Sequence, residues 1–444
     1  MVSNSILVRF FRLAGVKNTF LFLVLVIFSS SCSSSSSKKK ESKWVWTQDT
    51  IATAVYSKEE LLKIETNYTL SSKVGADNFE AYLPLLKDKK IGVVTNQTGV
   101  VLSIEYKKNN AFDFKKKQTH LVDFLLSKNI AIQKIFAPEH GFRGTADAGE
   151  HVIDGKDSKT GLPIISLYGD NKKPKHEQLA DIDIMVFDLQ DVGARFYTYI
   201  SSLHYIMEAC AENNIPLLIL DRPNPNGSIV DGPILEKDFT SFVGMHPIPL
   251  LHGMTIGEYA QMINGEKWLI NGAQCKLTVI PCIYYNRKMN YSLPVKPSPN
   301  LPNDQAVNLY ASLCLFEGTN VSVGRGTEKQ FQIYGSPYLP KSNFSFIPKP
   351  NFGAQNPLYN GTECYGEDLS THSRVNKLEL KWLIKAYQST ADKSKFFNPF
   401  FTKLAGTKKL QQQIENEASE KEIRKSWEKG LIEFKGMRTK YLIY

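Results

Sequence analysis

Short apolar runs alternate with helix-spaced segments between residues 91 and 227, and this alternation constrains the fold more than any other feature. The runs that we predict as strands are IGVVTN (91–96), AIQKIFAPEH (131–140), DIMVFDLQD (183–191) and IPLLILDRPNPNG (215–227). Between them, HLVDFLLSKN (120–129) and TYISSLHYIMEACAENN (198–214) are predicted as helices because their apolar residues recur at helical spacing. Strands that are apolar throughout are typical of a sheet covered by helices. We therefore predict an α/β fold with a Rossmann-like, mostly parallel sheet and helices on both faces.

Polar side chains follow each of the four predicted strands. The groups are Thr95-Asn96-Gln97; Glu139-His140; Asp188, Gln190 and Asp191 with Arg195 just beyond; and Asp221-Arg222 with Asn224 nearby. Ordinary turns use the same residue types, so one such group would mean little. In open α/β sheets, however, ligands bind outside the carboxyl ends of the strands. Four groups together favour a binding site on that edge of the sheet.

The segment IFAPEHGFRGTADAGE (135–150) places two carboxylates, Glu139 and Glu150, in one glycine-rich loop. Asp188 and Asp191 add a second carboxylate pair at the next strand end. Glycoside hydrolysis needs one protonated carboxyl group and generally a second group that supplies or activates the nucleophile. Partial burial or a nearby like charge raises the pKa of the acid. The sequence thus favours acid–base chemistry on a glycosidic bond.

Arginines and aromatic residues surround these carboxylates. The arginines are Arg143, Arg195, Arg222 and Arg325, and the aromatic residues are Phe196, Tyr197 and Tyr199. Arginine binds a substrate carboxylate in bidentate fashion. The aromatic rings could stack on sugar faces or simply pack in the core.

The second half of the chain has a different texture. PVKPSPNLPN (294–303), which contains Asn300, and FEGTNVSVGRGT (316–327), which contains Glu317, Asn320 and Arg325, are expected to form a second wall over the sheet edge. Segments 378–387 and 410–430 are predicted to be helical, with their charges on a solvated face.

Several function classes lack their motifs. There is no G-x-G-x-x-G, no G-x-x-x-x-G-K-[ST] and no G-x-S-x-G, which disfavours a nucleotide cofactor and a serine hydrolase. Glu139, His140, Glu150, His151 and Asp154 offer zinc-binding atoms, but H-E-x-x-H is absent and adjacent residues of an extended segment point apart. We therefore expect no metal and no other cofactor. The formal net charge of +10 is spread along the chain without a nucleic-acid-binding motif, so we expect an anionic surface or substrate and no nucleic acid.

The N-terminus predicts export. Arg9, Arg12 and Lys17 precede an apolar run at 20–28 that is too short for a comfortable transmembrane helix, and small residues then lead to Cys32. Residues 29–32, Ser-Ser-Ser-Cys, resemble a bacterial lipobox, although the pattern prefers an aliphatic residue where Ser29 stands. We predict a signal peptide at 1–32, lipidation of Cys32, a flexible Ser/Lys-rich linker at 33–76 and a membrane-anchored lipoprotein facing the periplasm or cell surface. The remaining cysteines are odd in number and predict no disulfide framework.

A family resemblance sharpens this interpretation. The ordered strings FAPEHGFRG, AGE, TGLPIISLYG, FDLQDVGARFYTYI, DRPNPNG, DGPIL, HGMTIGEYA, PSPNLP and FEGTNVSVGRGT resemble the bacterial NamZ-like exo-β-N-acetylmuramidase family over roughly residues 80–444. The resemblance implies a Rossmann-like catalytic domain, placed at 77–285, and a smaller C-terminal α+β auxiliary domain at 286–444. It also implies release of N-acetylmuramic acid from the non-reducing end of peptidoglycan fragments, without a cofactor.

The resemblance leaves the site roles partly open. We assign Glu139 as general acid and Glu150 and Asp188 as candidates for the base or for orienting the acetamido group, which could itself be the nucleophile. The predicted substrate-binding residues are Asn96, His140, Arg143, Gln190, Asp191, Arg195, Tyr197, Asp221, Arg222, Asn224, Asn300, Glu317, Asn320 and Arg325. We expect the arginines to bind the lactyl carboxylate of muramic acid. The alternatives are a metal-dependent hydrolase or amidase of wall fragments and a non-catalytic saccharide-binding lipoprotein.

Overall fold

The computed structural model describes residues 72–107, 110–143 and 154–444, together with 45–46 and 52–53. The chain divides into two units, residues 1–71 and 72–444. In the first unit, β1 (Val45–Trp46) pairs antiparallel with β2 (Ala52–Thr53). Cys32, the predicted signal peptide and most of the predicted linker lie outside the described residues. Among the residues that are described, no helix is long and apolar enough to cross a bilayer.

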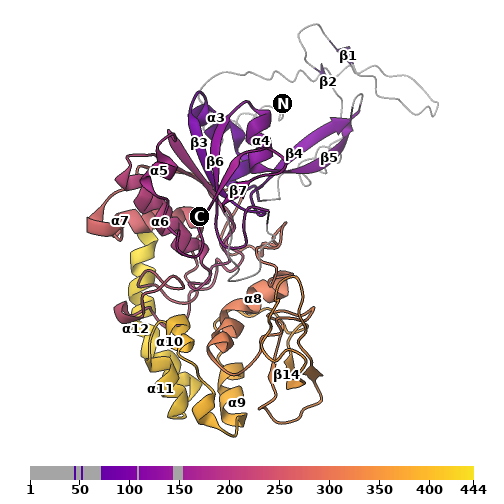
Figure 1. Cartoon of the computed structure of the whole chain (residues 1–444), viewed down its shortest axis with the longest axis vertical. Helices are drawn as coiled ribbons and strands as arrows, with labels where there is room; N and C mark the ends of the chain where they lie inside the picture. Colours follow the sequence, from indigo (N-terminus) through magenta and orange to yellow (C-terminus); the bar gives the residue numbers. More distant parts are fainter. Residues whose placement is uncertain (1–44, 47–51, 54–71, 108–109, 144–153) are drawn as a thin grey trace, which may run out of the picture. The chain divides into compact units, whose positions relative to one another are not determined.

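A seven-stranded sheet organises the first half of the second unit (Figure 1). Its strands are β3 (Lys90–Thr95), β6 (Ala131–Ala137), β7 (Gly155–Lys156), β8 (Pro163–Ser166), β9 (Ile184–Asp188), β10 (Leu217–Leu220) and β11 (Leu277–Ile280). They lie in the order β11-β10-β9-β3-β6-β8-β7, and all pairs are parallel except β7 with β8. Numbered along the chain, the six parallel strands follow the 3-2-1-4-5-6 order of a doubly wound fold. The four strands predicted from the sequence are confirmed.

Helices cover both faces of this sheet, as predicted. They are α3 (Phe79–Leu86) and α4 (Leu121–Ser127) on one face, and α6 (Tyr199–Glu212) and α7 (Ile256–Gly265) on the other, with the short α5 (His176–Leu179) preceding β9. Neighbouring residues of one strand point to opposite faces. Val93 thus packs in the core with α3 and α4, whereas Val94 packs in the core with α6 and α7. Because both faces are covered, the central strands β3, β9 and β10 are buried and apolar along most of their length.

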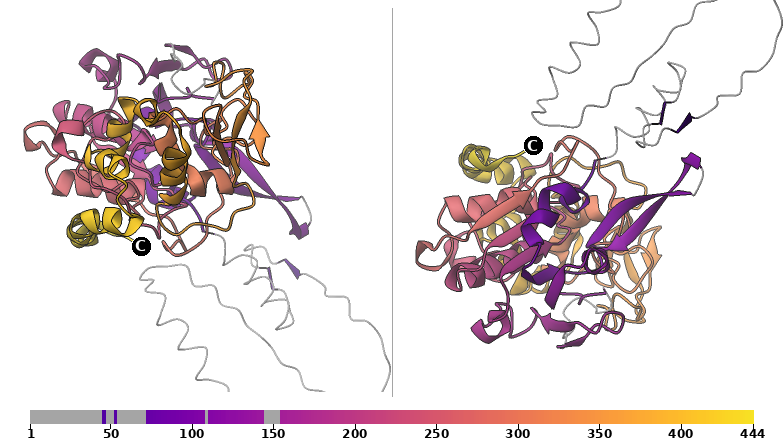
Figure 2. Two further views of the ribbon diagram at one scale, coloured as in Figure 1. Left: turned by 90° about the horizontal axis from the view of Figure 1, so that it is seen from below. Right: turned by 90° about the horizontal axis from the view of Figure 1, so that it is seen from above.

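A long hairpin and short 3-10 segments complete this half. β4 (Val100–Lys107) and β5 (Asn110–His120) pair antiparallel and project beyond the sheet (Figure 1, Figure 2). The imidazole of His120 then accepts a hydrogen bond from the Val122 amide and caps the predicted helix α4. The 3-10 segments of the unit are η1 (Gly75–Asp77), η2 (Lys237–Phe239), η3 (Ile270–Gly272), η4 (Cys314–Gly318), η5 (Lys393–Lys395) and η6 (Thr439–Tyr441).

The C-terminal part combines a small sheet with helices. β12 (Ile333–Ser336), β14 (Cys364–Asp368) and β13 (Ser345–Phe346) form an antiparallel sheet in that order. The helices are α8 (Asp304–Leu313), α9 (Lys381–Ser389), α10 (Phe400–Ala405), α11 (Lys409–Glu415) and α12 (Glu420–Arg438). The predicted helical segment 410–430 is two helices, because Glu417 adopts a φ of 57° and Ser419 caps α12. The α+β character of this part is confirmed.

The hydrophobic core is continuous across the predicted boundary between the two domains. One hydrophobic cluster contains residues of α6, α8 and α10, so apolar packing runs across the predicted boundary at 285/286, which stays a prediction. The second unit begins at Ser72. Ala76 is fully buried and the Gly75 amide donates to the carbonyl of Asp221, so residues 73–76 belong to this unit rather than to a linker.

Candidate active site

A cavity of about 250 Å³ lies where the carboxyl end of β6, the first turn of α6 and the C-terminal segments meet. Its lining residues are Glu139, His140, Tyr168, Phe196, Tyr197, Thr198, Tyr199, Phe242, Val243, Ser298, Asn300, Leu301, Tyr310, Cys314, Glu317, Arg325, Phe331, Phe400 and Leu404. Residues from 294–303 and 316–327 are among them, so these two segments form the expected second wall.

The sheet order brings the four predicted polar groups to one edge. β10, β9, β3 and β6 are consecutive neighbours, and the strand order reverses between β3 and β9. This is the position at which doubly wound proteins bind ligands. Of the four groups, however, only the one after β6 lines the cavity.

Glu139 is held at the cavity wall by a tight turn and by hydroxyl groups. The Gly141 amide donates to the Pro138 carbonyl, and both His140 and Gly141 have left-handed backbone conformations with φ of 72° and 73°. This conformation is costly for a histidine. The Thr198 hydroxyl donates to Glu139 Oε2 at 2.7 Å. Glu139 is half-buried and therefore both fixed and reachable from the cavity.

Tyr168 is the second hydroxyl group beside Glu139. Burial, together with the charge of Glu139 and a hydrogen bond to it, raises the pKa of Tyr168 to about 12. The phenol therefore keeps its proton at neutral pH. Tyr168 follows β8, a strand that the sequence did not reveal, and Thr198 lies in the quoted string FYTYI. Recognising β8 as a fifth strand end would have pointed to Tyr168.

Glu317 and Arg325 add two more charged side chains to the cavity lining. Arg325 Nε donates to Glu317 Oε1 at 2.5 Å, and its guanidinium lies over the Phe331 ring, 5.1 Å from the centroid. Burial alone would lower the pKa of Arg325, but the ion pair with Glu317 outweighs burial and raises it. Within the described part of the chain, no residue accepts a hydrogen bond from the two terminal nitrogens of Arg325. These nitrogens are suited to bind an anion.

The other three predicted arginines have structural partners. Arg143 pairs with Asp157 at 2.8 Å, and Arg222 forms a fully buried bidentate pair with Asp188 at 2.6 and 2.9 Å. Arg195 is fully buried, and burial lowers its pKa. Its guanidinium donates to the carbonyls of Pro233, Ile248, Leu404 and Ala405. None of these three lines the cavity, so the predicted binding role is replaced by ion pairing or by anchoring α10.

Asp188 and Asp221 likewise form contacts within the fold and do not line the cavity. The carboxylate of Asp188 is occupied by Arg222. That of Asp221 accepts hydrogen bonds from the Thr255 hydroxyl, the Gly257 amide and the Tyr444 hydroxyl at 2.7–2.8 Å. Burial is the largest effect on Asp221 and raises its pKa to about 6. The candidate role of Asp188 as base is therefore not supported by its position.

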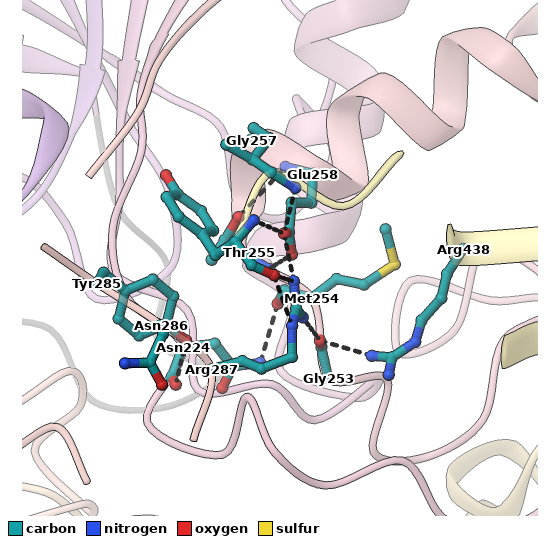
Figure 3. Close-up of polar contacts among 12 residues, drawn as sticks. Asn224, Gly253, Met254, Thr255, Gly257, Glu258, Tyr285, Asn286, Arg287 and Arg438 are labelled. Atoms are coloured by element: carbon teal, nitrogen blue, oxygen red, sulfur yellow. Dashed lines mark hydrogen bonds and ion pairs between the residues drawn. The ribbon is translucent and has the colours of Figure 1, made fainter. Parts of the chain in front are cut away.

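Figure 3 shows the polar contacts around the first turn of α7. Thr255 and Glu258 cap α7 reciprocally, and Arg287 donates to Glu258 at 2.7 Å. Asn224 donates to the Met254 carbonyl at 2.9 Å, and Arg438 donates to the Gly253 carbonyl. Asn224 thus holds a turn and does not line the cavity.

Three more predicted residues stabilise the turns after β3 and β9. The Asn96 amide donates to the Tyr199 hydroxyl at 2.6 Å. Gln190 donates to the carbonyls of Asp191 and Pro223, and Asp191 accepts from the Gly193 amide. All three are buried and none lines the cavity.

His140, Tyr197 and Asn300 complete the set that the structure brings to the cavity. The Tyr197 hydroxyl donates to the Pro297 carbonyl at 2.7 Å, and the Asn300 amide donates to Gly353. Asn320 lies at a different cavity. Glu150 falls in residues 144–153, outside the described structure, and so does His151.

Asp154, the described member of the alternative metal cluster beyond this gap, accepts a hydrogen bond from the Ser166 amide. Among the described residues there is no group of three or more His, Cys, Asp or Glu side chains placed to hold a metal ion.

The fold and the cavity together define an α/β protein of two parts, a doubly wound sheet and a smaller α+β part. Residues of both parts line a cavity that contains carboxylates and lies at the carboxyl edge of the sheet. The chain belongs to the exo-β-N-acetylmuramidase NamZ family: the model of its N-terminal domain matches residues 91–305 and that of its C-terminal domain matches residues 308–444.

Two kinds of relative support this membership. The chain is 40% identical over 385 residues to the peptidoglycan β-N-acetylmuramidase NamZ of Bacillus subtilis (strain 168), covering 82% of this chain and 89% of the relative. Crystal structures of two DUF1343 family proteins from Bacteroides fragilis NCTC 9343 are also similar. Their TM-scores are 0.75 and 0.66 at 44% and 27% identity, and each match covers 84% of this chain and 99% of the relative.

Proposed function

We propose that the protein is an exo-acting glycosidase that cleaves the β-1,4 bond and releases N-acetylmuramic acid from the non-reducing end of peptidoglycan fragments. The observation that carries the proposal is a cavity lined by both Glu139 and the Glu317–Arg325 pair, in a chain of the exo-β-N-acetylmuramidase family. Glu139 and Arg325 match the two demands of this substrate, a leaving oxygen that needs a proton and a carboxylate that needs a cation.

Glu139 is the general acid in this proposal. A protonated carboxyl group gives its proton to the leaving oxygen of the glycosidic bond. The hydroxyl groups of Thr198 and Tyr168 both contact Glu139. A hydroxyl can donate to a carboxylate and accept from a carboxylic acid, so this pair fits both protonation states of the cycle.

Arg325 recognises the lactyl carboxylate that distinguishes muramic acid from glucosamine. It is the one of the four predicted arginines that lines the cavity. Glu317 holds its Nε, which leaves the terminal nitrogens for a charge-assisted bond to the substrate. We expect Arg325→Ala to remove the preference for the muraminide, whereas Arg143→Ala, the matched arginine outside the cavity, keeps it. Equal loss of preference in both variants would contradict this assignment.

The decisive assay uses the full chain on a chromogenic β-N-acetylmuraminide and on the matching N-acetylglucosaminide. We expect chelator-resistant release from the muraminide alone, and its loss in Glu139→Gln by about 10²–10⁴-fold, the usual contribution of a general acid. Glu317→Gln in the same assay separates a role in orienting Arg325, seen as a raised KM, from a role in the chemical step, seen as a lowered kcat. Full activity of Glu139→Gln would overturn the assignment of the acid.

We also propose that the protein is exported and anchored through a lipid on Cys32. The basic, apolar and small-residue succession before Cys32 and the Ser/Lys-rich stretch after it support this location beside wall fragments. Fractionation of cells that express the wild type and Cys32→Ala tests it. We expect the wild type in the membrane fraction and the variant in the soluble fraction; membrane retention of the variant would refute lipidation at this residue.

A further inference from the structure

We propose that a second cavity, in the C-terminal part, binds a neutral N-acetylglucosamine unit of the glycan; the identity of the glycan rests on the proposed function. This cavity has a volume of about 390 Å³, larger than the 250 Å³ of the cavity at Glu139. Its lining residues are Asn320, Tyr338, Tyr359, Thr390, Ala391, Asp392 and Lys395. A space larger than the one proposed for a muramic acid unit can hold one hexosamine ring.

The floor of the second cavity is held by contacts between separate segments. The amide of Asn320 donates to the Phe396 carbonyl at 2.8 Å. The carbonyl of Asn320 accepts from the Tyr359 hydroxyl at 2.7 Å and from Ser336 Oγ at 2.8 Å. The backbone of one residue, Asn320, thereby joins the segment after η4 to β12, to the β13–β14 connection and to the C-terminal end of η5. The cavity is consequently formed before any ligand arrives.

Tyr359, which lines the cavity, has an unusual backbone conformation. Its φ is 63°, in the left-handed region that an aromatic residue rarely occupies. The hydrogen bond to Asn320 holds its ring against Tyr338, with the ring centroids 6.0 Å apart and the planes at 75°. Strained residues of this kind cluster at ligand sites.

The lining suits a neutral ring with hydroxyl groups. Tyr338 is 61% exposed, so its aromatic face is open to a ligand. The two charged side chains, Asp392 and Lys395, pair with each other at 3.0 Å and offer no unbalanced charge. An aromatic face for the C–H side of a sugar, with amide and hydroxyl groups for its polar edge, fits N-acetylglucosamine better than an anionic muramic acid.

The two cavities differ in charge but share a segment. Asn320 lies between Glu317 and Arg325 in the sequence, and these two line the first cavity. The cations at both cavities are paired, Arg325 with Glu317 and Lys395 with Asp392, but the Arg325 side chain is mostly buried whereas that of Lys395 is 80% exposed and screened by water. The stronger anion-binding group therefore lies at the first cavity. Alternating sugars of the glycan therefore match the two sites by charge.

Isothermal titration of the full chain with the β-1,4-linked tetramer of N-acetylglucosamine tests the proposal. This probe contains no muramic acid and is not a substrate of the proposed reaction, so binding is measured without turnover. We expect Tyr338→Ala to weaken binding about tenfold through loss of the aromatic face, and Tyr338→Phe to retain it. The matched control is Tyr284→Ala, which removes a tyrosine that is 59% exposed elsewhere and should leave binding unchanged.

Arg325→Ala distinguishes the two cavities. We expect this variant to bind the tetramer like the wild type. If Tyr338→Ala bound normally, or if Arg325→Ala abolished binding, the oligosaccharide would occupy the first cavity and the proposal would be overturned. Loss of binding in Tyr338→Ala together with an inactive wild type would keep the second site and refute the proposed function, so the two failures are distinguishable.

Discussion

The two sides of the sheet's carboxyl edge carry the same kinds of residue and use them in opposite ways. After β6, Glu139 is half-buried and lines a cavity. After β9 and β10, Asp188 and Asp221 are fully buried and held by Arg222 and by α7. An acidic residue after a strand thus becomes part of a site only where the surrounding elements leave it open, because a sealed carboxylate must be neutralised by the protein itself.

The largest expected effect separates stability from activity. Asp188→Asn removes the charge that balances the buried Arg222 guanidinium, and breaking such a pair costs roughly 3–5 kcal/mol. We expect urea unfolding to show this loss, with normal activity per folded molecule.

Glu139→Gln is the substitution to compare with Asp188→Asn, because it removes the charge of an acidic residue that lines the cavity. It should abolish activity and leave the free energy of unfolding nearly unchanged. If Asp188→Asn were as stable as the wild type, or if Glu139→Gln were strongly destabilised, the division between a structural role for Asp188 and a role in activity for Glu139 would be contradicted.

A smaller effect should appear in the pH dependence of stability. Burial raises the pKa of Asp221 from an ordinary value near 3.8 to about 6. Between these values the native state binds more protons than the unfolded state, so Asp221 lowers stability as the pH rises through this window. The contribution is on the order of 2–3 kcal/mol.

The difference in unfolding free energy between the wild type and Asp221→Asn, measured from pH 4 to pH 7, isolates this effect. We expect the wild type to lose stability relative to the variant as the pH rises. An asparagine can still accept from the Gly257 amide, which limits the structural disturbance. A difference that stays constant with pH would show that Asp221 does not titrate in this range.

The smallest expected effect concerns the support of Glu139. Thr198→Val removes the hydroxyl group that donates to Glu139 at 2.7 Å, a hydrogen bond worth about 1–2 kcal/mol. We expect kcat to fall by roughly five- to thirtyfold and the pH–rate profile to move, since Thr198 acts on the proposed acid. Thr439→Val, which removes a hydroxyl group bonded to the Lys435 carbonyl, is the control. Identical profiles in all three proteins would leave Thr198 without a positioning role.

Some of the predicted site residues lie together at one cavity, and their catalytic and binding roles stay predictions. Glu139 follows a recognisable apolar strand, and Glu317 and Arg325 lie in a glycine-rich segment that was expected to form a wall. The prediction of the site did not extend to Tyr168, because β8 is only four residues long and partly exposed, with little apolar pattern to reveal it.

The arginines show the limit of such reasoning most clearly. Arg195 and Arg325 both lie within strings that resemble the family, yet one is buried among carbonyl groups and the other lines the cavity. Arg195 is held by Leu404, which lies 209 residues further along the chain, whereas Arg325 is held by Glu317 of its own segment. The difference arises because α10 packs over Arg195, and this packing joins distant segments. Whether an arginine is buried or lines the cavity therefore cannot be predicted from its residue type and its position in the chain.

By itself, the sequence determined the alternation of strands and helices, the parallel sheet buried on both faces and the edge at which polar groups gather. These follow from apolar periodicity and from the direction shared by parallel strands, which are local properties. Only the tertiary structure decided which polar groups are sealed and which are open. That choice depends on where α7, α10 and the C-terminal segments pack, since a buried charge must find its partner from whatever element lies against it.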